Sequence, residues 1–190
     1  DLDPSRKPVM SRKAPPATPR PPELDLLLAC ARWPQRPEDC ELIRQLTSTP
    51  LDWPYLLRLA EHHRLAPLVA HNLQAANNIA PPLPLQSSAL EAIEQLRRLA
   101  QANTYNALRY LAEMRRVLQE FHSHGIPVSV LKGLPLAQTV FGDISLRAVG
   151  DIDLLIDEAS LLKADRILRG FRYRGLFQIE RFSPRRLAFY

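Results

Sequence analysis

Two aspartates one residue apart, Asp151 and Asp153, are the side chains of this 190-residue sequence best suited to hold a metal ion. If their segment is a strand, side chains alternate between its faces, so both carboxylates project to one side, about 7 Å apart. Ile152, Leu154 and Ile156 then point the other way, into a core. Neighbouring carboxylates repel each other unless a cation lies between them, and Mg²⁺ takes one or two carboxylates plus substrate phosphates. The spacing therefore predicts a metal site at this strand.

A second element with chemical potential lies about twenty residues upstream. Val128 to Leu131 is a short β-branched apolar run that ends in Lys132-Gly133, and Pro135 lies where a helix begins. A strand, a glycine turn and a helix N-terminus form an anion cradle, because free amides and the positive end of the helix dipole point at the ligand. Lys132 adds a positive charge. Together with the aspartates, this arrangement is suited to a metal-bound polyphosphate.

The two elements also carry a resemblance to a known family. The segment LKGLPLAQTVFGDISLRAVGDIDLLID, residues 131–157, resembles the signature of the nucleotidyltransferase-fold superfamily, whose fold is polymerase beta-like. It is most similar to a bacterial group of largely uncharacterised nucleotidyltransferase-like proteins with an LKG element and an R-x-x-x-DIDLL element. The resemblance extends from about Trp53 to Phe171.

The resemblance implies roles for five residues. Gly133 would lie against the phosphates of a nucleoside triphosphate, and Asp151 and Asp153 would be catalytic residues that bind Mg²⁺ or Mn²⁺. Lys132 and Arg147 match the narrower group and would contact phosphates. The implied activity is transfer of a nucleoside monophosphate from the triphosphate to an acceptor hydroxyl, whose identity these residues do not reveal.

The sequence also departs from the superfamily pattern. Gly133 is followed by Leu134 and Pro135, where the superfamily usually has Gly-Ser or Gly-Gly. The third carboxylate of the superfamily comes from a later strand, and Glu180 is the only local substitute. We therefore expect the catalytic region to be incomplete at its C-terminal end. A catalytically inactive binding or regulatory module on the same fold is the alternative function.

The predicted fold class is α+β, with a helical N-terminal region followed by a mixed sheet and flanking helices. Residues 1–22 are rich in proline and basic residues and are predicted to be a disordered leader. Residues 23–125 carry helical periodicity, including a long stretch from Ser87 to about His122 with a break near Asn103. Residues 126–190 are predicted to form the α/β core, against which the long helix packs.

The composition and the cysteine pattern indicate to which broad class of protein the chain belongs. Hydrophobic residues make up 46% and charged residues 24% of the chain, as in ordinary globular proteins. No apolar stretch approaches the ~20 residues of a membrane span and no signal peptide opens the chain, so the expected location is the cytoplasm. Cys30 and Cys40 show no metal-ligand pattern and are expected to be reduced thiols.

The basic C-terminal end of the sequence makes nucleic acid a further possible partner. Seven arginines lie between residues 166 and 186 and supply much of the net charge of +5. Such a surface can bind nucleic acid. A solvated face is the favoured interpretation of these arginines.

Overall fold

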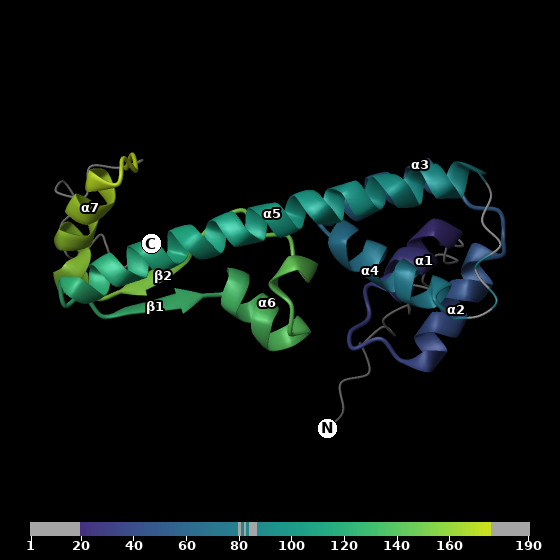
Figure 1. The fold of residues 1–190 in the computed structure, drawn as a ribbon, viewed down its shortest axis with the longest axis horizontal. Helices are drawn as coiled ribbons and strands as arrows, with labels where there is room; N and C mark the ends of the chain where they lie inside the picture. Colours follow the sequence, from purple (N-terminus) through teal and green to yellow (C-terminus); the bar gives the residue numbers. More distant parts are fainter. Residues whose placement is uncertain (1–19, 80, 82, 84–86, 176–190) are drawn as a thin grey trace, which may run out of the picture.

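The structure is a computed structural model that describes residues 20–79, 81, 83 and 87–175. The described residues form an elongated molecule around one long helix, α5 (Figure 1). Its elements in chain order are α1 (Pro22–Cys30), α2 (Pro37–Thr47), α3 (Trp53–His62), α4 (Ala66–Asn77), α5 (Ser87–Ser123), β1 (Val128–Leu131), α6 (Gly133–Phe141), the 3₁₀ turn η1 (Ile144–Leu146), β2 (Asp153–Ile156), the 3₁₀ turn η2 (Glu158–Ser160) and α7 (Leu161–Gly170). The predicted α+β class is confirmed.

Helices α1 to α4 pack around the N-terminal half of α5. Each of the four has a proline in its first turn, where a missing N–H costs nothing. The Asp52 side chain accepts a hydrogen bond from Tyr55 N and caps α3. Their apolar faces meet in one core, whose most deeply buried members include Leu26, Leu27, Ile43, Leu56, Val69, Leu73 and Leu96.

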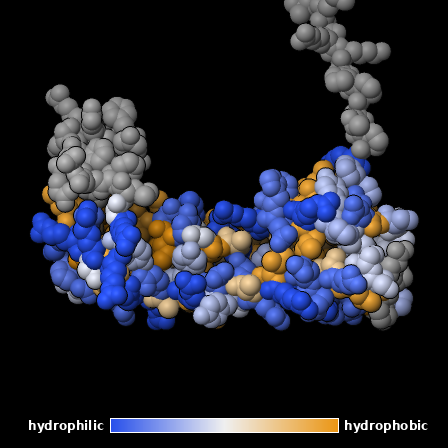
Figure 2. All heavy atoms as spheres, turned by 90° about the horizontal axis from the view of Figure 1, so that it is seen from above, coloured by the Kyte–Doolittle hydropathy of each residue, from blue (hydrophilic) through white to orange (hydrophobic). Residues whose placement is uncertain are grey.

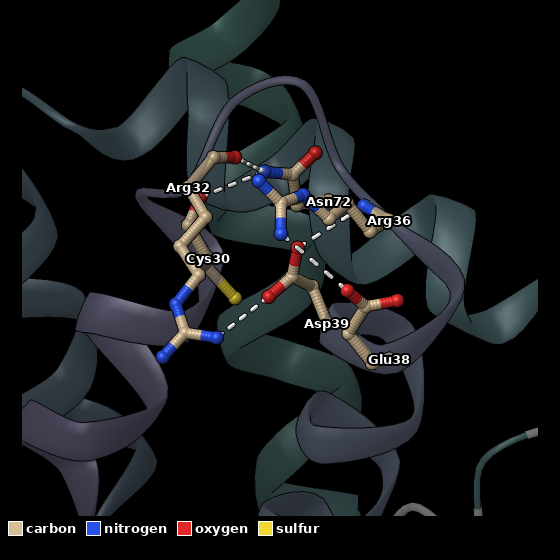
Figure 3. A network of polar contacts seen from close by, with 6 residues as sticks. All are labelled: Cys30, Arg32, Arg36, Glu38, Asp39 and Asn72. Atoms are coloured by element: carbon tan, nitrogen blue, oxygen red, sulfur yellow. Dashed lines mark hydrogen bonds and ion pairs between the residues drawn. The ribbon is translucent and has the colours of Figure 1, made fainter.

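A polar network fastens α1, α2 and α4 to one another (Figure 3). Asn72 on α4 is fully buried, and its Nδ2 donates to Cys30 O at 2.8 Å and to Arg32 O at 3.2 Å. Asp39 on α2 accepts from Arg32 Nη1 at 2.6 Å and from the backbone N–H of Arg36 at 3.1 Å. These bonds satisfy groups at helix ends that the core would otherwise leave unpaired.

Helix α5 joins two separate cores. Its 37 residues extend about 55 Å at 1.5 Å per residue. The predicted break near Asn103 is wrong, because α5 is continuous there. The helix ends in a glycine turn: Gly125 has φ +65°, and Ile126 N donates to Phe121 O at 2.9 Å. Near this end lies the second core, formed by Val117, Phe121, Ile126 and Ala164.

The sheet lies against this second core. Within the described residues it consists of β1 and β2, which are antiparallel, with Val128 opposite Ile156 and Leu131 opposite Asp153. Leu154 and Ile156 pack on the core, as predicted, whereas Leu155 on the other face is exposed. A two-stranded sheet is marginal alone, so packing against α5 and α7 stabilises it. Among the described residues, Leu131 and Leu155 of the other face are exposed.

The surface is mostly hydrophilic. Seen from above, the molecule carries polar and charged side chains over most of its length, interrupted by hydrophobic patches (Figure 2). In the part of the chain that the structure describes, no helix combines the length and the apolar character needed to cross a bilayer.

Candidate active site

The turn between β1 and α6 has an unusual backbone. Lys132 has φ +37° and Gly133 has φ +59°, so two successive residues occupy the left-handed half of conformational space. Glycine adopts this conformation freely, but it is unfavourable for lysine. Such strain persists only where the surrounding structure enforces it, and it is concentrated at functional sites. The turn also places Gly133 at the N-terminus of α6, as the sequence predicts for an anion cradle.

Lys132 and Asp153 contact each other across the sheet. Leu131, just before the turn, is the register partner of Asp153, so the turn lies at the start of β2. The Nζ of Lys132 lies 3.1 Å from Oδ2 of Asp153. That oxygen is buried, yet no group in the described ranges donates a well-aligned hydrogen bond to it. An ionised oxygen in this position can accept a further cationic or hydrogen-bonding ligand.

The backbone of Asp151 lies close to the same turn. Strand β2 begins at Asp153, so Asp151 stands before the strand, and the alternation expected from the sequence does not apply to it. A Cβ built on Gly133 would lie 3.8 Å from the backbone oxygen of Asp151. The Asp151 side chain is exposed. The structure therefore brings both aspartates next to the Lys132-Gly133 turn by different routes.

Helix α5 anchors the loop that carries Arg147 and Asp151. The Asn103 Nδ2 donates to Ser145 O at 2.7 Å and to Arg147 O at 3.2 Å. The Tyr110 hydroxyl donates to Gly150 O at 2.7 Å. Because Asn103 and Tyr110 are seven residues apart, they lie two turns apart on one face of α5. The loop is thus held at both ends, and Arg147 and Asp151 keep their places.

A cation from the helical region also reaches this loop. Arg64 follows α3 with φ +57°, and its Nη1 lies 3.9 Å from the position that a Cβ on Gly150 would occupy. Sequence reasoning assigned no role at this site to Arg64, Asn103 or Tyr110. Each of the three contacts a segment 40 or more positions away, so no pattern of neighbouring residues could have revealed these contacts. The one regularity in the sequence is that Asn103 and Tyr110 are spaced to lie on the same face of α5.

A cleft adjoins Asp151. It has a volume of about 910 Å³ and lies between α5, β2 and the end of α7. Glu113 at its wall accepts hydrogen bonds from Arg116 at 2.6 Å and from the Tyr173 hydroxyl at 2.6 Å. The Arg116 bond holds the Glu113 pKa below its usual value. Partial burial, together with the Glu113 bond, raises the pKa of Tyr173 to about 12, so this hydroxyl stays a donor at neutral pH.

The donor set suits a hard divalent cation held in part by its substrate. Among the described residues, no group of three or more histidines, cysteines or carboxylates could hold a metal ion. Two carboxylates with substrate phosphates are nevertheless what Mg²⁺ accepts. The Oδ2 of Asp153, which is ion-paired with Lys132 but accepts no hydrogen bond within the described residues, fits that role. Glu180, the candidate third carboxylate, lies outside the described residues.

Comparison with known proteins gave one result. The model of a family described as "Uncharacterised nucleotidyltransferase" matches residues 49–185, which is most of the chain and includes the turn, both aspartates and the loop between them. No curated protein and no solved structure matches the chain.

Proposed function

The chain belongs to this family of uncharacterised nucleotidyltransferases, as its LKG and DIDLL elements predicted, and its general role is nucleotidyl transfer. From this membership we propose that it transfers a nucleoside monophosphate from a nucleoside triphosphate to an acceptor hydroxyl, with Mg²⁺ or Mn²⁺, in the cytoplasm. The observation that carries the proposal is the contact of Lys132 with Asp153 beside the Gly133 turn.

The phosphates would lie at the turn. The amides at the N-terminus of α6 point toward an anion there, and Gly133 has no side chain to obstruct it. Lys132 would move from Asp153 to a phosphate oxygen when the nucleotide binds. Arg147 is a further phosphate ligand in this proposal, because its side chain forms no hydrogen bond or ion pair within the described ranges.

Asp151 and Asp153 would hold the metal ion. When bound, Mg²⁺ would offset the charge of the triphosphate and orient it for in-line attack. The protein's own contribution is to fix the carboxylates: Asp153 by its strand register with Leu131, and Asp151 through the bond from Tyr110 to Gly150. In this proposal both carboxylates would be held near the turn before the substrate binds, which would lower the entropic cost of reaching the reactive geometry.

A second candidate function is a nucleotide-binding module without catalysis. Its support is that the described residues bring only two carboxylates to the turn, whereas activation of an acceptor hydroxyl usually needs a general base. The two functions differ in one measurable product. Transfer releases pyrophosphate, whereas a binding module holds the nucleotide unchanged.

The test is Mg²⁺-dependent binding of NTPs, followed by a label-transfer assay with α-labelled NTPs and cell extract. Asp151→Asn and Asp153→Asn should each weaken metal-dependent NTP binding by about tenfold or more, a loss of about 1.4 kcal/mol. Glu91→Gln, an exposed carboxylate elsewhere on α5, is the matched control and should bind as wild type does. Equal binding by wild type and both aspartate variants would exclude the metal site.

A further inference from the structure

The cleft beside Asp151 extends along α5 away from the proposed phosphate site. At one end Tyr110 is bonded to Gly150, next to Asp151. At the other end the Arg116 guanidinium lies 4.1 Å from the centre of the Phe171 ring. Residues 109 and 116 are separated by about 10 Å along the helix axis, so the cleft offers roughly the length of a nucleoside.

The floor of the cleft is apolar and its rim is polar. Side chains that pack on the second core form the floor, among them Val117, Leu154 and Leu168. The rim carries hydrogen-bonding groups, including Arg109, Glu113 and Tyr173. An apolar floor with few polar groups at defined positions is typical of sites for small ligands with a flat, partly polar ring.

The charges are arranged along the cleft in a definite order. Arg109 lies at the Asp151 end, and its side chain has no ion-pair partner in the part of the chain that the structure describes. Glu113 and Arg116, one and two turns further along α5, are paired with each other. With the Asp151 carboxylate engaged by the proposed metal ion, Arg109 can attract an anionic group at this end, whereas the far end is electrically balanced.

Asp151 connects the cleft to the turn. Its backbone oxygen faces Gly133, and the residue also lines the cleft. A ligand whose phosphates lie at Gly133 would thus have its remaining atoms directed past Asp151, along α5.

We propose that this cleft holds the nucleoside of the triphosphate, with the phosphate next to the sugar on Arg109, the base on the floor at Leu154 and Leu168, and the base edge at Glu113. This inference rests on the proposed function, and it adds a base-binding site to the phosphate site. The Oε1 of Glu113 accepts from Arg116 and Tyr173. Its Oε2 remains to accept from an N–H or amino group of a base.

The direct test fills the cleft. Ala112 is an exposed helical residue that lines the cleft, so Ala112→Phe should fold while it occupies the site of the base. Ala102, also exposed on α5 but away from the cleft, supplies the control Ala102→Phe. Titration calorimetry with Mg²⁺ compares each NTP with inorganic tripolyphosphate, which has the phosphates but no nucleoside, and thermal unfolding verifies folding.

We expect Ala112→Phe to lower the affinity for the best-bound NTP about tenfold or more, with tripolyphosphate binding as in wild type. Ala102→Phe should change neither. Unchanged NTP affinity in Ala112→Phe, or an equal loss for tripolyphosphate, overturns the assignment of the cleft and leaves the proposed function standing. If NTP binding is intact and only transfer to the acceptor falls, the cleft belongs to the acceptor instead, and the inference is wrong.

Failure of the proposed function gives a different result, in which wild type binds neither NTP nor tripolyphosphate in the presence of Mg²⁺. A second variant tests the base edge. Glu113→Gln replaces the acceptor oxygen by an amide that also donates, so the ratio of affinities among the four NTPs should change while tripolyphosphate binding does not. An unchanged ratio removes Glu113 from base recognition.

Discussion

The ammonium group of Lys132 lies 3.1 Å from a buried carboxylate oxygen of Asp153. The lysine belongs to the turn after β1 and the aspartate to the first position of β2, so the strand register itself brings them together. Both side chains are partly exposed, at 56% and 30%. Such a pair contributes at most about 1 kcal/mol to stability. In the function proposed above, the lysine would neutralise the carboxylate until a metal–nucleotide complex replaced it.

This exchange predicts opposite effects of one substitution. Lys132→Met retains most of the aliphatic stem but removes the charge, so Mg²⁺ alone should bind more tightly, because no cation competes for Asp153. Mg²⁺–NTP should bind less tightly, because a phosphate ligand is lost. Unfolding free energy should change by about 1 kcal/mol or less. Calorimetric titrations with Mg²⁺ alone and with Mg²⁺–NTP measure the two changes in affinity. A loss of affinity in both titrations would contradict the proposed replacement of Lys132 by the metal–nucleotide complex at Asp153.

Tyr110 is predicted to position Asp151 through Gly150. Tyr110→Phe removes the bond to Gly150 O, which should cost about 1 kcal/mol of unfolding free energy. A stability loss of this size leaves the protein folded, so it would not by itself change the KM for Mg²⁺–NTP. Because the loop also loses one of its anchors, we expect this KM to rise. Tyr105→Phe, an exposed tyrosine on the same helix, is the control and should behave as wild type. Urea unfolding and initial-rate kinetics give the two measurements.

Ala substitutions at Gly133 and Gly142 distinguish the effect of backbone strain from an effect on phosphate binding. Gly133 has φ +59° and Gly142 has φ +70°, so Ala at either position should cost about 1 kcal/mol of unfolding free energy. No heavy atom lies within 4 Å of a Cβ on Gly142, whereas Gly133 lies at the proposed phosphate site. Only Gly133→Ala should weaken tripolyphosphate binding. Equal effects of the two variants on that binding would place the phosphates elsewhere.

Asp39 should make stability depend on pH. The hydrogen bond from Arg32, aided by the backbone N–H of Arg36, holds the Asp39 pKa below its usual value in the folded state. A depressed folded pKa stabilises the protein above the unfolded pKa of about 3.9, and that contribution is lost as the pH falls through the folded pKa.

Asp39→Asn should therefore reduce unfolding free energy by about 2 kcal/mol at neutral pH, the usual effect of losing hydrogen bonds to a charged group. The difference from wild type should shrink below about pH 4. Glu38→Gln, whose carboxylate is 67% exposed, is the control, with a change of at most about 1 kcal/mol. Denaturant titrations between neutral pH and about pH 3 measure the unfolding free energies of the wild type and of both variants. If the difference between wild type and Asp39→Asn stayed constant down to the acidic end, the Asp39 charge would not be the source of the stabilisation.

Sequence patterns were most informative where structure is local. The helical periodicity from Ser87 to about His122 and the alternation that turns Leu154 and Ile156 to the core depend on neighbours within a few residues. The sequence therefore predicted this helix and this core face. The expected break near Asn103 failed because that polar residue turns to the loop at Ser145 and Arg147 instead of interrupting its own helix.

The motif residues around the site could be named from the chain, because Lys132, Gly133, Asp151 and Asp153 lie in two short segments with a recognisable pattern. Their contacts came from the fold: the pairing of Leu131 with Asp153 brings Lys132 to its carboxylate, and Tyr110 reaches Gly150 across 40 positions. The same is true of Arg64 and of the cleft along α5. Helical and strand periodicity specify which face of an element is buried, but not which distant segment covers it, and that choice is made by packing of the whole chain.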